Sequence, residues 1–375
     1  MYISIRGRVW IEAEAANMVE SVGYYTKHRK LPLVVKIEGK YVTFFVPAIS
    51  GESVAHTYQT LLADELLKLK ENVCSLCRQG KFLKSTNSEV LRETVGAELY
   101  SNIMESQKGK NENGEEQKSK KKKEEELNKA LKIEEAIVAS CAVEDIGGFL
   151  FADNPNVKRT SSFMTGYMVP VFEALQYSLT DPQLQSRYAL GTRFVGVEEA
   201  GAVEDEERTE HSKQASGQMI YYVELSSAVY TFSFDLDTKF IGKHTYVSDD
   251  NYGKKVGALS DENVKNRKLA ALESLKKLLL EFPIGAKRAR FNPITSWESL
   301  AIAVSDDVWT LPSSFTEDYI DRAAKKISSY NVNTEIYAYA KGLSVSGDTV
   351  RVPDSPEDAI SKAIEAAKNR ISNEV

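Results

Sequence analysis

The chain has 375 residues, of which 42% are hydrophobic and 27% charged, and its formal net charge is −6. This composition is typical of a soluble globular protein with one or two domains. The sequence contains no run of about 18 apolar residues, which argues against a transmembrane helix. Its N-terminus lacks the basic start and apolar centre of a signal peptide, so we expect a cytoplasmic protein.

The first predicted element is a strand over residues 2–11. Apolar residues alternate along it, at Ile3, Ile5, Val9 and Ile11. This period of two predicts a sheet with one core face. The other face would carry Tyr2, Arg6, Arg8 and Trp10. Arginines beside aromatic rings suit contacts with RNA, but a face covered by a helix or another strand is an equally good interpretation.

A hairpin and a helix follow this strand. The apolar runs LVVKI and YVTFFVP flank a turn at residues 38–40, a pattern typical of a β-hairpin. A helix is predicted from Ser50, whose hydroxyl can cap the free N–H groups of the first turn. Residues 105–126 contain no aromatic and no large apolar side chain. We expect a mobile, low-complexity insertion there, because such a segment cannot bury enough surface to offset its ordering entropy.

The second half of the chain predicts a long strand and two long helices. Residues 219–237 alternate as a strand, and the alternation slips at Ser226 and Ser227, which predicts a β-bulge. One helix is expected over residues 261–281. Another is expected from Ser355, with a proline in its first position. This order of strands, helices and long insertions predicts an α+β fold built on one central sheet.

The three cysteines are too few for a disulfide framework. Cys74 and Cys77 form a single CxxC, and Cys141 lies far away in the sequence. A zinc site would need two ligands beyond the CxxC pair, so ordinary thiols are the favoured interpretation. We expect no metal ion and no cofactor.

The sequence contains no G-x-S-x-G, HExxH, P-loop or dinucleotide-binding motif. His28 and His56 are the best candidates for a general base in RNA cleavage. Neither forms a recognisable pair with a second acid or base. We therefore expect no catalytic residue and a protein that is not an enzyme.

Three basic clusters contrast with the acidic net charge, at residues 27–30, 158–161 and 285–291. Each combines positive side chains with nearby glycine or hydroxyl groups, which are the groups that contact phosphates. The N-terminus of the helix at Ser50 is a fourth candidate anion site. Local positive potential steers a polyanion even on an acidic chain, so the four sites together indicate RNA binding.

These segments resemble the backbone subunit of Cascade-type CRISPR complexes, the Cas-seven family. It is also called DevR-type and belongs to the RAMP superfamily, and the archaeal type I-A branch is the most similar. The similar segments are NMVESVGYYTKHRKLPLVV (residues 17–35), VPAISGESVAHTYQ (46–59), EDIGGFLFADNPNVKRTSSFMTGYMVP (144–170), SGQMIYYVELSSAVYTFSFDLD (216–237) and GAKRARFNP (285–293).

The resemblance implies one domain, residues 1–375, with an RRM-like (ferredoxin-like) core sheet. It further implies a helical insertion at 61–140, a thumb-like β-hairpin at 181–218 and a C-terminal α/β extension of the core at 296–375. The thumb would carry the acidic run EDEER at 204–208. We expect that acidic tip to face solvent or a neighbouring subunit.

The resemblance also implies a function. Several copies would stack along a single-stranded CRISPR RNA, together with other Cascade subunits, and present the RNA for pairing with target DNA. No membrane partner is expected. One alternative is a RAMP-type endoribonuclease that processes CRISPR repeat RNA, with His28 or His56 as the base. Another is a protein-interaction module whose basic loops are incidental.

The residues that the resemblance places at the RNA fall into five groups. They are Asn17, Lys27, His28 and Arg29 in the loop after the first strand; Ser50, Gly51, Glu52, His56 and Gln59 on the following helix; Lys158, Arg159, Thr160 and Ser161 on a strand lining the groove; Lys287, Arg288 and Arg290 in the basic loop; and Arg193 and Phe194 at the thumb.

Overall fold

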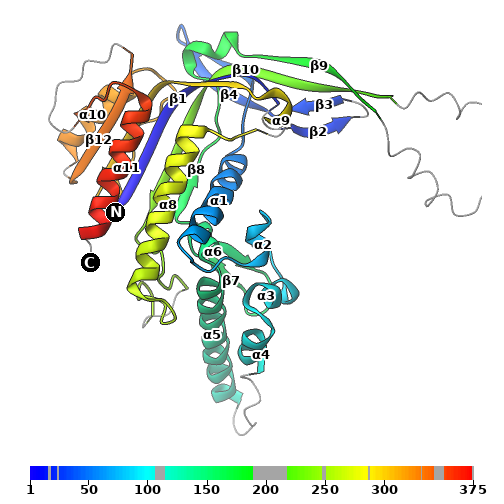
Figure 1. Ribbon diagram of the computed structural model, residues 1–375, viewed down its shortest axis with the longest axis vertical. Helices are drawn as coiled ribbons and strands as arrows, with labels where there is room; N and C mark the ends of the chain where they lie inside the picture. Colours follow the sequence, from blue (N-terminus) through cyan, green and yellow to red (C-terminus); the bar gives the residue numbers. More distant parts are fainter. Residues whose placement is uncertain are drawn as a thin grey trace, which may run out of the picture.

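The computed structural model describes residues 1–15, 18–22, 25–105, 115–188, 218–246, 251–285, 288–330, 332–341 and 350–373 (Figure 1). Within these ranges one large sheet contains β1 (Tyr2–Glu14), β2 (Met18–Val22), β3 (Tyr25–His28), β8 (Phe163–Thr165), β9 (Leu179–Tyr188), β10 (Gln218–Asp237), β11 (Ile294–Ser305), β12 (Thr334–Ala340) and β13 (Val350–Arg351).

The order of strands along this sheet is β13-β12-β11-β1-β10-β3-β2, and β8 and β9 also pair with β10. Most neighbours are antiparallel, whereas β3 runs parallel to β10 and β13 runs parallel to β12. The predicted α+β class with one central sheet is therefore confirmed, and the sheet is mixed.

One face of the sheet packs on three helices, α1 (Gly51–Lys68), α8 (Asp261–Glu281) and α11 (Pro356–Asn373). The buried cluster on this face includes every apolar residue of the predicted alternation in β1. The helix starts are also confirmed. The hydroxyl of Ser50 accepts the N–H of Ser53 at 3.3 Å, and the hydroxyl of Ser355 accepts the N–H of Asp358 at 3.1 Å.

The opposite face of β11 and β12 is covered by α10 (Tyr319–Ser329) and the loop before it. Neighbouring Arg8 on β1 is buried, and its guanidinium donates to Glu173 at 2.7 Å and to Glu298 at 2.8 Å. The interpretation of a covered face is therefore correct for Arg8. Trp10, nearer the end of β1, is 43% exposed.

The predicted insertion at 61–140 is helical. It contains α2 (Ser75–Arg78), α3 (Ser88–Val95), α4 (Ala97–Glu105) and α5 (Glu115–Ser140), which project away from the sheet (Figure 1). Residues 115–126 of the segment predicted to be mobile are helical, and the mobility itself stays a prediction. Glutamate and lysine have high helix propensity and form favourable pairs along a helix, so this composition also suits a solvated helix. Residues 106–114 lie outside the described ranges.

Two further antiparallel pairs are a hairpin and a ribbon. β4 (Lys30–Ile37) and β5 (Lys40–Pro47) form the predicted hairpin, with φ of 48° at Glu38 and 82° at Gly39, as a tight primed turn requires. After the short helix η1 (Phe172–Tyr177), β9 and the first half of β10 form a long antiparallel ribbon. Most of β9 lies in the segment predicted as the thumb, 181–218, whereas its partner in β10 begins at the last residue of that segment. Residues 189–217 lie outside the described ranges.

The predicted bulge beside Ser226 and Ser227 is present as a register shift, but the extra residue lies in β1. Ile11 pairs with Ala228 and Glu14 pairs with Ser226. Between these two pairs β1 therefore has one residue more than β10. Among the helices that the structure describes, none combines the length and apolarity needed to cross a membrane.

Candidate nucleic-acid interface

β3 and its junction with β4 place cations beside aromatic rings. Lys27 is exposed on β3, and the Arg29 guanidinium lies 6.0 Å from the ring centre of Tyr167. Tyr25 stacks on Tyr222 of β10, with ring centres 6.2 Å apart. Tyr167 is 46% exposed and Tyr222 is 42% exposed. This arrangement suits a single-stranded nucleic acid, because rings stack with bases while cations contact phosphates.

His28, between these two cations, is buried against β10. Its Nε2 lies 2.9 Å from the hydroxyl of Ser226, and its Nδ1 lies 2.9 Å from the carbonyl of Arg29. Burial lowers the pKa of His28, so the imidazole is held neutral. The prediction that the His28 side chain contacts RNA is therefore wrong. Strand alternation turns this side chain inward when its neighbour Lys27 faces out.

Lys30 of the same cluster is tied to the sheet. Its Nζ donates to Glu224 at 2.8 Å, and the N–H of His28 donates to the other oxygen of that carboxylate at 2.8 Å. Burial raises the pKa of Glu224, but these hydrogen bonds outweigh burial and hold it below its usual value. Lys27 and Arg29 are therefore the better candidates for contacting phosphate.

The N-terminus of α1 packs against the end of β8. The Thr165 hydroxyl donates to the carbonyl of Gly51 at 2.8 Å, and a Cβ on Gly51 would lie 2.9 Å from the Thr165 carbonyl, so the approach requires glycine. Ser50 is buried as the helix cap, whereas Glu52 and His56 are exposed. The carboxylate of Glu52 in the first turn competes with a phosphate for the helix N-terminus.

Gln59, farther along α1, is buried against α6 (Ala142–Gly147). A Cβ on Gly147 would lie 2.2 Å from Gln59 Nε2, so the two residues pack directly. The prediction that Gln59 contacts RNA is wrong, because its side chain fills the space between two helices. His56, one turn earlier, faces outward with its ring 5.3 Å from that of Phe82.

The second basic cluster is divided by β7 (Val157–Arg159), which pairs with β6 (Phe149–Phe151). Lys158 and Thr160 are exposed, and Ser161 is half-buried. Arg159 is buried, and its guanidinium donates to the carboxylates of Glu134, at 3.0 Å, and Asp145. The prediction that Arg159 contacts RNA is therefore wrong.

The third basic cluster lies toward the same end of the sheet as β3. Its described part, α9 (Arg288–Phe291), packs beside β1 and directly precedes β11. For Arg288 and Arg290 the structure describes the backbone alone. Lys287, Asn17, Arg193 and Phe194 lie outside the described ranges, so their predicted contacts stay predictions.

Residues 5–324 match the family model of the "CRISPR-associated negative auto-regulator DevR/Csa2". The chain belongs to this DevR/Csa2 family. It is 30% identical to CRISPR-associated protein Cas7/Csa2 1 of Saccharolobus solfataricus, over 94% of this chain and 92% of that protein. It is also 30% identical to CRISPR-associated aCascade subunit Cas7/Csa2 2 of the same organism, over 95% and 97%.

A chain of a solved "CRISPR RNA-guided surveillance complex, pre-nicking" aligns over 98% of this chain and 100% of its own, with 12% identity and a TM-score of 0.49. The family that the sequence motifs predicted is thus confirmed, by the family model and by the two archaeal relatives.

Sequence reasoning missed three aromatic residues of this candidate interface: Tyr25, Tyr167 and Tyr222. They come from three separate segments that only the sheet pairing brings together. A signal was present, since Tyr25 and Tyr167 each lie close to a predicted basic residue or glycine. The position of Tyr222 depends on the parallel pairing of β10 with β3, which the sequence pattern does not reveal.

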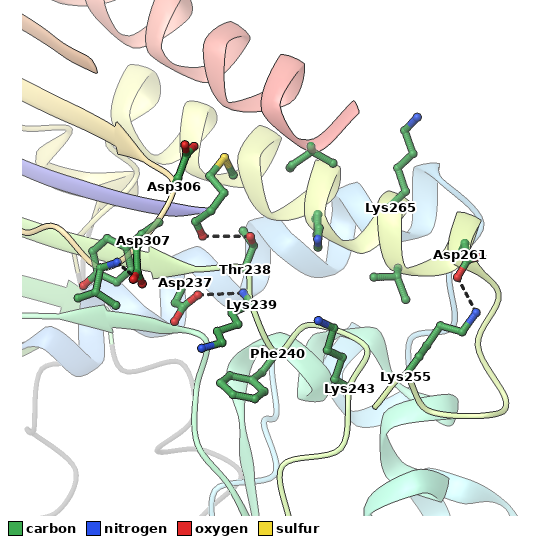
Figure 2. Close-up of a pocket in the computed structure, with 16 residues that line it drawn as sticks. Asp237, Thr238, Lys239, Phe240, Lys243, Lys255, Asp261, Lys265, Asp306 and Asp307 are labelled. Carbon is green, nitrogen blue, oxygen red and sulfur yellow. Dashed lines mark hydrogen bonds and ion pairs between the residues drawn. The ribbon is translucent and has the colours of Figure 1, made fainter. Parts of the chain in front are cut away.

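A second group of lysines lines a pocket of about 930 Å³ at the other end of the sheet, where β1 begins and β10 ends. Figure 2 shows Lys239, Lys243 and Lys265 around it, with Asp306 and Asp307 on the opposite side. Lys255 pairs with Asp261 at 2.5 Å. Because charges of both signs line this pocket, its potential toward a phosphate chain is weak. The β3 end is the better candidate for the nucleic-acid interface.

Proposed function

We propose that this DevR/Csa2 chain is a guide-RNA-binding backbone subunit of a CRISPR surveillance complex. Several copies stack along the RNA, with other subunits of the complex, and leave the bases between contacts free to pair with target DNA. In this proposal the central sheet is an RRM-like core and the β9–β10 ribbon is the base of a thumb. The name of the relative Cas7/Csa2 2, an aCascade subunit, supports membership of such a complex.

The observation that carries the proposal is the strip of Lys27, Arg29, Tyr25, Tyr222 and Tyr167. It lies beside the β9–β10 ribbon, so one strand of RNA crossing β3 would also meet the ribbon. Phosphate contacts and stacking on rings recognise every sequence alike, which is what a guide of variable sequence needs.

We further propose that the chain does not cleave RNA. His28 is buried with both ring nitrogens occupied, so it cannot reach a ribose hydroxyl. His56 is exposed, but its ring contact is with Phe82 and it has no ion pair among the described residues. A general base without a positioned partner is poorly equipped for phosphodiester cleavage.

The test is a gel-shift titration of the full chain against labelled single-stranded RNA of several lengths, with recovery of the RNA afterwards. We expect intact RNA, bound in steps that increase with length and weakened by salt. Lys27→Glu/Arg29→Glu should lower affinity at least tenfold. Arg322→Glu/Lys325→Glu on α10, which changes the net charge equally, should leave it within about twofold.

Two outcomes contradict the proposal. RNA that is cut by the wild type and spared by His56→Ala would support an endoribonuclease instead. Equal loss of affinity in the two double variants would show that net charge, rather than the β3 strip, governs binding.

A further inference from the structure

Three cysteines that are distant in sequence meet in the core beside α1. Cys74 precedes α2, Cys77 lies within it, and Cys141 joins α5 to α6. Their Sγ atoms all lie within 4.8 Å of one another, and all three side chains are buried. Cys141 is distant from the CxxC pair in the sequence but adjoins it in the structure. The end of α5 returns to α2, where the N–H of Ala142 donates to the carbonyl of Asn72 at 2.8 Å.

Backbone N–H groups point at two of the sulfur atoms. The N–H of Cys77 donates to Cys74 Sγ at 3.4 Å, and the N–H of Cys74 donates to Cys141 Sγ at 3.5 Å. Such bonds stabilise negative charge on sulfur, and the thiolate is the form that binds metal ions. These two backbone bonds therefore favour the thiolate form of Cys74 and of Cys141.

A buried carboxylate adjoins the three thiols. Glu144 of α6 has no exposed surface, and its Oε1 lies 2.9 Å from Cys77 Sγ and accepts the N–H of Leu83 at 3.0 Å. Within the part of the chain that the structure describes, its Oε2 is buried without a hydrogen-bond partner. Leaving a buried carboxylate oxygen unpaired costs free energy, and a bound cation would remove that cost.

We propose that Cys74, Cys77, Cys141 and Glu144 form a binding site for a thiophilic divalent metal ion, Zn²⁺ in the first place. Zn–S bonds of about 2.3 Å in a tetrahedron put the sulfur atoms roughly 3.8 Å apart. Sulfur atoms that already lie within 4.8 Å reach that separation by small side-chain rotations. The carboxylate beside Cys77 then supplies the fourth ligand.

Two other states of the cluster, a disulfide and three neutral thiols, account for fewer of its four side chains. A disulfide between two cysteines would use neither the third thiol nor the unpaired oxygen of Glu144. Three packed neutral thiols would leave that oxygen unpaired as well. A metal ion uses all four groups.

The site would be structural, because all four groups are buried and no position is open to a substrate. It would join α2 to the α5–α6 junction and so fasten the helical insertion beside α1. This role is independent of RNA binding, so the two proposals fail separately.

Elemental analysis of the full chain after extensive dialysis tests the site directly. We expect one zinc ion per chain. Replacement by Co²⁺ should produce sulfur-to-metal charge-transfer absorption together with the intense visible bands of a tetrahedral thiolate site. Cys77→Ser and Cys141→Ser should each lose these bands. Glu144→Gln, which keeps the shape of the side chain, should weaken Co²⁺ binding about tenfold or more.

Ser75→Ala is the matched control, because this exposed residue lies between the two cysteines of the CxxC, and it should retain one ion. If a cysteine variant does not fold, the wild-type Co²⁺ spectrum decides alone. A wild-type chain that takes up neither Zn²⁺ nor Co²⁺, or one that mass spectrometry shows to contain a disulfide, would overturn the proposal.

Discussion

The basic clusters at 27–30 and 158–161 each divide into surface and core residues, and the same rule divides both. In each, a lysine on a strand faces outward and the next residue faces inward: Lys27 precedes buried His28, and Lys158 precedes buried Arg159. Successive side chains of a strand point to opposite faces, so a basic run presents only alternate residues to a ligand. The comparison separates surface charge, which can bind a polyanion, from core charge, which stabilises the fold.

Arg159 shows what a cation needs in order to be buried. Besides its two carboxylate partners, its guanidinium donates to the carbonyls of Phe240, at 2.9 Å, and Lys243, at 2.8 Å. Asp145 also accepts from Arg267 at 2.9 Å. The network joins α5, α6 and α8 through hydrogen bonds that offset the cost of removing these charges from water.

The largest effect expected from this comparison is that of Arg159→Met. It leaves the carboxylates of Glu134 and Asp145 short of a partner in the core, and removing one side of a buried ion pair costs about 3–5 kcal/mol. Urea unfolding measures it. Lys158→Met, one residue earlier and exposed, should stay within about 0.5 kcal/mol of the wild type. Equal destabilisation by the two variants would contradict the division between surface and core.

The next effect concerns the aromatic part of the interface. Tyr222→Ala removes an exposed ring that stacks on Tyr25, and stacking of a base on such a ring contributes about 1–3 kcal/mol. The dissociation constant for single-stranded RNA should rise accordingly, as measured by fluorescence anisotropy. Tyr330→Ala, at the end of α10, removes a ring of similar exposure and should leave affinity unchanged. A loss in both variants would place the stacking elsewhere.

Local patterns in the sequence predicted those features of the fold that depend on residues close together in the chain. The alternation in β1, the turn at Gly39, and the caps at Ser50 and Ser355 depend on neighbours a few residues away, and the structure has each of them. The order of the predicted elements added the α+β frame, and the charge pattern located the basic segments. Most of the fold was accessible from the sequence for this reason.

The parts of the site that were missed depend on distant contacts. Arg159 is buried because residues 240–243 and α5 cover it, and the three cysteines meet because α5 returns to α2. The bulge was predicted at Ser226 and Ser227, but the extra residue lies in β1, and alternation in β10 alone cannot show this. Burial and cross-strand pairing are properties of the assembled sheet, and no short motif contains them.

A smaller effect should appear in the pH dependence of stability. Burial lowers the pKa of His28 below its ordinary value of 6.5. Just below pH 6.5 the imidazole is therefore protonated in the unfolded chain but neutral in the folded protein. Stability should therefore be fully present above pH 6.5 and fall as the pH drops through that value toward the lowered pKa. Urea midpoints between neutral pH and about pH 5 measure the fall.

His28→Gln should flatten that pH dependence, because its side chain does not titrate. His56→Gln should preserve it, because His56 is exposed. If the stability of the wild type is constant over this pH range, His28 is accessible to protons, and its side chain is exposed rather than buried.

The smallest expected effect separates single phosphate contacts. Each contact with single-stranded RNA changes the slope of log K against log salt by about 0.7, so Lys27→Ala and Lys158→Ala should each flatten the slope by roughly that amount. Lys325→Ala on α10 should leave it unchanged. A flattened slope for Lys27→Ala alone would limit the RNA path to the β3 end, whereas a flattened slope for both would extend it past the end of α1 to β7. The slope is decisive here because it counts cations at the RNA, and buried charges such as Arg159 do not contribute to it.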